Sequence, residues 1–189
     1  LSPVAVCGIA SPPPTIDGSL DDPAWRQATF LAPFVRMTTH DAPSQKVTCR
    51  VVRGPERLYL AFECYEDDIK KLSTEADERD HPRAWADDCV QLFIAPGDPR
   101  NVYFHIIVTA ANVIFDEKIL EGGEGRDPSW DAGVLSAARR HKDRWTCELS
   151  LPLSDVAATL PVKDGWTFNV ARAEQPHNEW SSWAPLNAS

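Results

Sequence analysis

The sequence predicts an all-β domain, an antiparallel β-sandwich of the immunoglobulin-like or jelly-roll type with one or two short helices. Short runs in which apolar and polar residues alternate recur along the whole chain, as in strands with one buried face. These runs are separated by turn-forming residues, since the chain contains 16 Pro and 9 Gly. Helical signal is confined to two brief segments.

The alternating runs mark the expected strands. The clearest cover residues 47–51, 58–64, 89–95, 102–108, 145–151 and 166–170. Weaker candidates lie at residues 4–9, 30–36, 113–118 and 134–140. Long loops are expected at residues 66–86 and 121–133, the second of which is rich in Gly and charge.

The first two clear strands are expected to form a hairpin with its turn centred on Pro55 and Glu56. In this register Cys49 and Cys64 are offset rather than opposite, so a disulfide between them would need a register slip. The five cysteines include no CxxC pair and are expected mainly as small buried apolar residues. The expected cross-strand pairs are Val51–Leu60, Cys49–Phe62 and Val47–Cys64.

Two segments carry signals for short helices. Asp21 and its acidic neighbour precede Pro23 and Trp25, which places acidic residues and a proline in a first helical turn. Ser154 is a candidate cap for a second helix that runs through Ala158.

Length and charge limit the possible roles of the chain. Its 189 residues are expected to form a single domain over 1–189. The formal net charge of -9 argues against nucleic acid and anionic membrane surfaces as partners. No apolar run approaches the roughly 18 residues of a membrane span. Neutral ligands, or cations held by carboxylates, remain compatible with this charge.

No catalytic constellation stands out, so the chain is not expected to be an enzyme. There is no Gly-x-Ser-x-Gly motif, and the five histidines have no zinc-like spacing. Glycosidases need two carboxylates at a set separation, but 28 acids make any pair easy to find. The acids considered are Asp87, Asp88, Asp116 and Glu148.

Among metals, the sequence is most compatible with calcium, which would be a structural ion. It prefers oxygen ligands from clustered acids, and Asp67 and Asp68, like Asp87 and Asp88, lie at predicted strand ends. The alternative is that these acids only keep the loop ends polar. A haem with a Met ligand would have to use Met37, the only Met in the chain, which fits a core residue better.

The candidate binding residues are Trp85, Gln91, Tyr103 and His105. If the strand of Gln91 pairs with the strand that carries Tyr103 and His105, these three side chains share one face beside Trp85. Sugars are bound by such mixtures, because rings stack on their C–H faces and planar polar groups bond their hydroxyls. A polar, solvated sheet face is the alternative.

The other six tryptophans divide into two groups. Three have apolar neighbours or start a helix and are expected in the core, namely Trp25, Trp145 and Trp166. Three fall in loops or near the C-terminus and are expected to line a rim, namely Trp130, Trp180 and Trp183.

Several short segments, in a fixed order, make the chain similar to a known family. Residues 14–186 resemble the carbohydrate-binding modules of family 9 and their relatives in the DOMON-like superfamily of β-sandwiches. The segments that carry the resemblance are Thr15-Ile16-Asp17-Gly18, Leu20-Asp21-Asp22-Pro23-Ala24-Trp25, Leu58-Tyr59-Leu60-Ala61-Phe62-Glu63, Trp85-Ala86-Asp87-Asp88-Cys89-Val90-Gln91-Leu92-Phe93-Ile94, Trp130-Asp131, Trp145-Thr146-Cys147-Glu148-Leu149 with Pro152-Leu153, Trp166-Thr167-Phe168-Asn169-Val170-Ala171-Arg172 and Ser182-Trp183-Ala184-Pro185.

This resemblance implies a non-catalytic sandwich that binds a carbohydrate, often with bound calcium, and that is secreted, periplasmic or otherwise extracellular. An attached or associated catalytic domain is a further implied partner. Saccharide-binding members grip chain ends between two Trp rings, and Trp85 matches the first ring. The second ring and the C-terminal strand are expected after Trp183, in a segment that this chain does not reach.

Two residues depart from the family pattern. Gln91 stands where the family has Glu, and Ile107 stands where a charged residue is expected. The resemblance therefore implies the fold but not the sugar specificity. Two alternative functions are a DOMON-like domain that binds haem or another cofactor through Met37, and a protein-interaction domain of a larger extracellular protein. The latter predicts an exposed apolar patch that includes Ile107.

Overall fold

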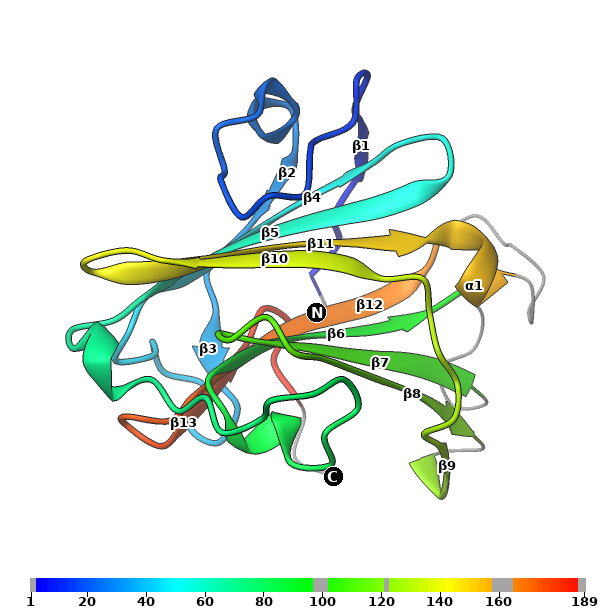
Figure 1. Cartoon of the computed structure of the whole chain (residues 1–189). Helices are drawn as coiled ribbons and strands as arrows, with labels where there is room; N and C mark the ends of the chain where they lie inside the picture. Colours follow the sequence, from blue (N-terminus) through cyan, green and yellow to red (C-terminus); the bar gives the residue numbers. More distant parts are fainter. Residues whose placement is uncertain (1–2, 97–101, 121–122, 158–164, 187–189) are drawn as a thin grey trace.

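The computed structural model describes residues 3–96, 102–120, 123–157 and 165–186, whose strands form two sheets stacked face to face (Figure 1). The first sheet contains β1 (Gly8–Ile9), β2 (Thr29–Leu31), β4 (Val47–Arg53), β5 (Arg57–Tyr65), β10 (Leu135–Arg140) and β11 (Arg144–Pro152). The second contains β3 (Val35–Arg36), β6 (Cys89–Ala95), β7 (Val102–Thr109), β8 (Ile114–Leu120), β9 (Gly125–Asp127), β12 (Thr167–Glu174) and β13 (Glu179–Ser182).

The strand order is β1-β4-β5-β11-β10 in the first sheet, where β2 also pairs with β4, and β3-β13-β12-β6-β7-β8-β9 in the second. Within the described ranges every pairing is antiparallel except that of β1 with β4. The predicted antiparallel β-sandwich is therefore confirmed. Its described helices are short: η1 (Pro23–Arg26), η2 (Ile69–Lys71) and η3 (Ala84–Ala86) are 3₁₀ turns, and α1 (Leu153–Ala157) is an α-helix.

The predicted hairpin is confirmed in its register. β4 and β5 pair Val51 with Leu60, and the two cysteines stay offset, with Cys49 opposite Phe62. All five cysteines are free thiols, and four of them are buried, as expected for small apolar core residues. The register follows from the period of two, because a slip by one residue would turn the core-facing side chains of Val47, Cys49 and Val51 to the outer face of the sheet.

The predicted strand over residues 30–36 was wrong, since this segment forms two strands in different sheets. β2 ends at Leu31 in the first sheet and β3 begins at Val35 in the second. Pro33 lies at the crossing, and its nitrogen has no hydrogen to donate to a strand ladder. Leu31 and Phe34 on either side of it are buried in the core.

The predicted strand over residues 4–9 is limited to its last two residues. β1 pairs in parallel with β4 at Gly8, opposite Val52. Residues 4–7 would have to pair with the preceding part of β4, but β2 already occupies that edge at residues 49–51. The edge of β4 is therefore shared by two short strands.

The core lies between the two sheets and includes several of the aromatic side chains. Trp145 is fully buried, as predicted, and Trp166 is partly buried against the core. Trp183 was predicted at a rim, but this was wrong, because its ring stacks on Phe168 with 5.2 Å between centroids and is buried. Trp130 also packs inward, 4.5 Å from the ring of Phe104.

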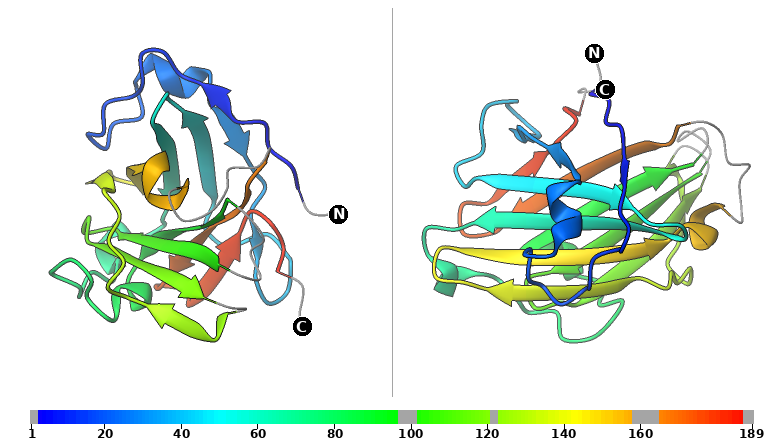
Figure 2. Two further views of the ribbon diagram at one scale, coloured as in Figure 1. Left: turned by 90° about the vertical axis from the view of Figure 1, so that its right-hand side faces the viewer. Right: turned by 90° about the horizontal axis from the view of Figure 1, so that it is seen from above.

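The outer face of the first sheet is covered by the N-terminal segment with η1 (Figure 2). Trp25 is buried there and donates from Nε1 to Glu148 Oε1 over 2.7 Å. The second oxygen of Glu148 accepts from the backbone nitrogens of Asp17 and Gly18. Glu148 on β11 thus holds this layer in place. Asp116, another of the four acids considered for catalysis, lies on the second sheet, so these two carboxylates do not form a pair on one sheet.

The outer face of the second sheet is partly covered by the segment between β5 and β6, which carries η2 and η3. Asp87 fixes this segment by accepting from the Oγ of Ser73 and from the backbone nitrogens of Glu75 and Ala76. A small apolar cluster lies beneath it, formed by Ala76, Ala84, Cys89, Ile107 and Ala173. The segment therefore seals one end of this face and positions η3 at its border.

Candidate functional site

Three of the four predicted binding residues, Gln91, Tyr103 and His105, lie on the outer face of the second sheet, and the fourth, Trp85, lies in η3, which packs against β6 and β7. β6 and β7 pair as the sequence analysis required, with Gln91 opposite Ile107 and Phe93 opposite His105. Tyr103 lies two residues before His105 on β7, so its side chain is on the same face. We call this surface, together with the neighbouring Trp85, the Trp85 face.

Trp85 is the most exposed aromatic residue of this surface. It lies in η3, packs beside β6 and β7, and leaves 55% of its area accessible. Ala84 directly before it is fully buried, and Asp87 shortly after it is fixed by three hydrogen bonds. The ring is therefore presented to solvent from a backbone that is anchored on both sides.

Gln91 does not present a free amide. Its side chain is 8% exposed, its Oε1 lies 2.9 Å from His105 Nε2, and its Nε2 is directed at Cys89 Sγ. His105 Nδ1 lies 3.0 Å from Glu117 Oε1 on the other side. The imidazole is thus fixed between two oxygens, and Gln91 holds the ring in position.

Glu117 is a residue of this site that sequence reasoning missed. It lies opposite His105 in the β7–β8 pairing and is nearly inaccessible. The hydrogen bond from His105 lowers the pKa of the Glu117 carboxyl below 4.5, against the effect of burial, and Arg126 at 3.5 Å acts in the same direction. Only the register of β8 identifies this acid, since nothing distinguishes it from the other acids in the sequence.

The rings of Phe93, His105 and Tyr103 lie together on the Trp85 face. Phe93 stacks on His105 with 4.3 Å between centroids and 9° between planes, and it meets Tyr103 at 6.5 Å in a tilted arrangement. Trp180 of β13 pairs with Ala173 and packs against the apolar cluster under η3, so it borders the same face. Phe93 and Trp180 were not among the predicted binding residues.

Three buried acids lie close together at the strand ends where the sequence predicted calcium. Glu66, Asp88 and Glu174 each place one oxygen within 4.8 Å of the others, and we call them the Glu66 cluster. Burial raises the pKa of Glu66 to about 7 and that of Asp88 to about 6. The guanidinium of Arg172 is buried beside these acids, and its Nη2 lies 3.1 Å from Glu66 Oε2. At the solvent side, His177 Nδ1 lies 3.0 Å from Glu174 Oε1.

The other acids proposed for calcium have different surroundings. Asp87 is engaged by the loop that it fixes. Asp68 accepts from the backbone nitrogen of Lys70 at the start of η2. Asp67 is largely exposed, although it can reach an ion together with Glu66 and His177.

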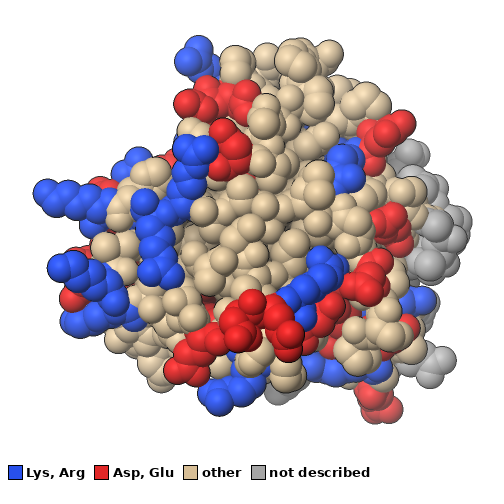
Figure 3. Space-filling model, in the orientation of Figure 1, with Lys and Arg blue, Asp and Glu red and all other residues tan. Residues whose placement is uncertain are grey.

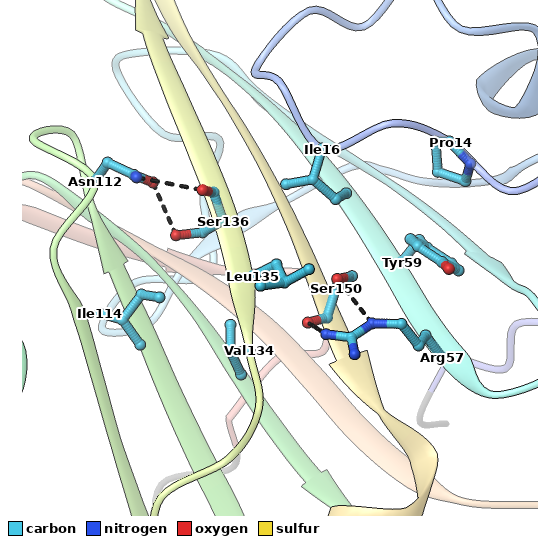
Figure 4. Close-up of a pocket in the computed structure, with 10 residues that line it drawn as sticks. All are labelled: Pro14, Ile16, Arg57, Tyr59, Asn112, Ile114, Val134, Leu135, Ser136 and Ser150. Atoms are coloured by element: carbon cyan, nitrogen blue, oxygen red, sulfur yellow. Dashed lines mark hydrogen bonds between the residues drawn. The ribbon is translucent and has the colours of Figure 1, made fainter.

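A separate pocket of about 530 Å³ lies between the first sheet, the N-terminal segment and the start of β8 in the second sheet (Figure 4). Arg57 in its wall donates to Ser150 Oγ, to Ser150 O and to Gly133 O. Ile16, Leu135 and Tyr59 supply most of its apolar wall. No sequence pattern indicated this pocket. Neither it nor the pocket at the end of the sandwich by Cys7 and Trp166 is lined, among the described residues, by Met37 or a histidine.

A family model described as "Carbohydrate family 9 binding domain-like" matches residues 16–184 of the chain. The chain belongs to this family. The family 9 match covers every described strand except β1, and it includes Trp85 and the β6–β7 pair. No curated protein sequence matches the chain significantly.

Solved structures share the fold of this family 9 domain. A protein from Bacteroides uniformis superposes with a TM-score of 0.69 at 15% identity, over 87% of this chain and 80% of that one. A family 9 carbohydrate-binding module from Caldicellulosiruptor kristjanssonii in complex with glucose gives 0.63 at 15% identity, over 95% and 88%. Its complex with cellotriose gives 0.62 at 15% identity, over 91% and 84%.

Proposed function

We propose that this family 9 domain binds a saccharide on the Trp85 face without catalysing a reaction. The observation that carries the proposal is the exposed ring of Trp85 on an anchored turn. Tryptophan is usually largely buried, so a tryptophan that is 55% exposed favours a ligand surface. The C–H faces of pyranose rings stack on such a platform.

Polar groups on the same face supply hydrogen bonds for sugar hydroxyls. We assign the direct hydrogen bond to Tyr103, because both ring nitrogens of His105 are already bonded to Gln91 and Glu117 and leave its ring face for contact with the sugar. Gln91 was expected to contact sugar as well, but it is buried and bonded to His105. We therefore give Gln91 and Glu117 positioning roles, because both fix the imidazole.

The first saccharides to test are glucose and cellotriose, because a family 9 module of the same fold has been solved with each. A neutral ligand also suits a chain with a formal net charge of -9. We further propose a secreted or periplasmic location and an attached or associated catalytic domain that the module targets to its substrate. No helix in the described residues is long and apolar enough to cross a membrane.

We also propose that the Glu66 cluster holds a structural calcium ion. Its three acids are buried beside one buried cation, Arg172, so ionised carboxylates leave two negative charges there when His177 is neutral. Oxygen donors of this kind are those that calcium prefers. The ion would neutralise the cluster and join the end of β5 to the start of β6 and the end of β12.

The test is a titration of the protein with glucose and with cellotriose. Binding is measured by calorimetry or by Trp fluorescence, in the presence and in the absence of calcium. Trp85→Ala is expected to weaken binding by about tenfold or more, since a central aromatic contact contributes at least that much. Phe30→Ala is the matched control, because Phe30 is also 55% exposed but lies on the first sheet. Equal affinity of wild type and Trp85→Ala for a bound saccharide would refute the proposed site.

The two alternative functions are less well supported by the structure. The apolar patch expected around Ile107 for a protein partner was wrong, since the segment with η3 covers this residue and leaves it 1% exposed. Met37 donates its backbone nitrogen to Trp180 O, beside β3, and lines neither pocket of the described chain. No observation on the described residues therefore favours a haem site at Met37.

A further inference from the structure

The pocket between the first sheet, the N-terminal segment and the start of β8 has one charged residue in its lining, Arg57. Its other lining residues are apolar, aromatic or neutral and polar. We call it the Arg57 pocket. We propose that the Arg57 pocket binds a small aromatic carboxylate, with the carboxylate on Arg57 and the ring against Leu135 and Ile16. This site is separate from the Trp85 face, which belongs to the other sheet.

Three residues in register form the base of the Arg57 pocket. Ser150 on β11 pairs with Leu135 of β10 on one side and with Tyr59 of β5 on the other. The three side chains therefore share one face of the first sheet, and it is the outer face, because Leu149 beside Ser150 lies in the core. Ser150 is fully buried beneath Arg57, to which it is hydrogen-bonded. The guanidinium thus forms the floor between two larger side chains.

Arg57 is held in place by neutral groups rather than by an acid. Its Nε donates to Ser150 Oγ over 3.0 Å, and its Nη2 donates to Ser150 O over 3.0 Å and to Gly133 O over 2.6 Å. None of the ion pairs between described residues includes Arg57. Its positive charge is therefore fixed in position without a contacting counter-charge, which favours an anionic ligand.

The remaining nitrogen of Arg57 faces away from the sheet. Because the edge with Nε and Nη2 bonds Ser150 and Gly133, Nη1 points in the opposite direction. Figure 4 shows Nη1 as the nitrogen of this group without a dashed line. Arg57 is partly exposed, so the two N–H groups of Nη1 are available to a carboxylate.

Two acids near the pocket are already engaged by donors of the chain. Glu148 lies two residues before Ser150, and both of its oxygens accept hydrogen bonds from the N-terminal segment. Asp155 accepts from the backbone nitrogen of Gly133 over 2.7 Å. The charge that a ligand meets in the pocket is therefore that of Arg57, although the formal net charge of the chain is -9.

The rest of the lining favours an aromatic ligand body over a sugar. Leu135 is 57% exposed, and Ile16 of the N-terminal segment lines the same pocket. The polar pair beside them is satisfied internally: Ser136 Oγ donates to Asn112 Oδ1 over 2.8 Å, and Asn112 Nδ2 donates to Ser136 O over 3.3 Å. Several hydroxyls of a sugar would therefore lose water without gaining partners, which is unfavourable, whereas an aromatic ring needs none.

The size and surroundings of the pocket suit such a ligand. β10 crosses the middle of the view in Figure 1, and Figure 3 shows that the surface there is almost free of Lys, Arg, Asp and Glu. The volume of about 530 Å³ lies within the range of about 300–1,000 Å³ that is usual for small-molecule sites. An acid with a single ring fits this space.

Mapping of amide chemical shifts by NMR tests the proposal on the whole chain. 4-Hydroxybenzoate is expected to shift the amide signals of Tyr59, Leu135 and Ser150 in a saturable way. Two matched compounds are expected to bind about tenfold more weakly or less: 4-hydroxybenzamide, which keeps the ring but has no charge, and glucuronate, which keeps the charge but has no aromatic ring.

Two variants locate the ligand in the pocket. Arg57→Gln is expected to weaken 4-hydroxybenzoate binding by about tenfold, because the charge-assisted hydrogen bond is lost. Leu135→Ser is expected to weaken it by about fivefold, because an apolar wall is lost, and this variant should fold, since Leu135 is exposed. Arg26→Gln, at an exposed arginine outside the pocket, is the charge-matched control.

The outcome is independent of saccharide binding, because 4-hydroxybenzoate is observed directly. The proposal is overturned if 4-hydroxybenzoate shifts no amide signal of the pocket, or if 4-hydroxybenzamide or glucuronate binds there as tightly. It is also overturned if Leu135→Ser and Arg57→Gln both keep the affinity of the wild type. If Arg57→Gln does not fold, the comparison of Leu135→Ser with Arg26→Gln decides alone.

Discussion

The imidazole of His105 lies between two side-chain oxygens, with Nδ1 3.0 Å from Glu117 Oε1 and Nε2 2.9 Å from Gln91 Oε1. These contacts connect β8, β7 and β6 across the Trp85 face. A ring protonated at both nitrogens donates to both oxygens, whereas a neutral ring is satisfied if the Gln91 amide turns its nitrogen toward Nε2. The ring position is therefore determined by its two neighbours on the sheet.

Glu117→Gln should destabilise the fold by about 1–3 kcal/mol at neutral pH, the usual cost of disrupting a buried hydrogen bond to a charged group. The folded pKa of Glu117 lies below 4.5, so its stabilising contribution is complete above the unfolded value and is lost as pH falls through the folded value. Urea unfolding at a series of pH values measures this effect. A deficit that stayed constant down to low pH would contradict the assignment, and Asp21→Asn serves as the control.

The pair of Gln91 and His105 should show energetic coupling. In a double-mutant cycle with alanine at each position, we expect a coupling free energy of about 0.5–3 kcal/mol, because the two side chains are hydrogen-bonded in a buried site. Gln91 and Tyr103 share no described contact and should be additive within about 0.5 kcal/mol. Equal coupling in the two cycles, measured by urea unfolding, would mean that Gln91 does not act through His105.

Trp25→Phe should cost more stability than Trp145→Phe, by about 1–3 kcal/mol. Both changes remove the same atoms from a buried tryptophan. However, the Nε1 of Trp25 donates to buried Glu148, while the Nε1 of Trp145 has no partner among the described residues. Chemical unfolding of the two variants measures the difference. An equal loss of unfolding free energy in the two variants would show that the hydrogen bond from Trp25 to Glu148 does not stabilise the fold.

Calcium should raise the melting temperature of the domain. At about 100 times its dissociation constant, a ligand adds about 2.7 kcal/mol, which is about 5–10 °C for a chain of this length. Glu174→Gln should remove part of this increase, because it eliminates one acid of the Glu66 cluster, whereas Asp21→Asn should retain it. Thermal unfolding with calcium and with a chelator provides the comparison, and an identical response of Glu174→Gln and wild type would exclude this cluster.

The sheet face on which each side chain lies could be predicted from the sequence. Which other segments pack over that side chain could not. The period of two placed Gln91, His105 and Ile107 on the outer face, where they lie. It contains no information about the segment with η3, which packs on Ile107 from outside. For the same reason Gln91 was expected as an exposed amide, although its neighbours bury it.

The sequence also could not identify residues that become part of the site only through pairing with distant strands. Glu117 becomes part of the site only through the pairing of β8 with β7, and Trp180 only through that of β13 with β12. The crossing between the sheets at Pro33 was missed because a run of apolar residues continues through it. Local pattern thus predicted the longer strands and the β4–β5 hairpin, whereas the contacts of the site are set by tertiary packing.

The short strands at the borders of both sheets bear on how copies of this domain behave at high concentration. An open strand edge invites pairing with another chain, and natural sheets limit this with short or charged edge strands. β1, β2, β3 and β9 have only two or three residues each, and the longer β10 ends in Arg139 and Arg140. Each border is thus too brief or too charged for a stable intermolecular ladder, so molecules of this sandwich can be crowded together without joining into continuous sheets.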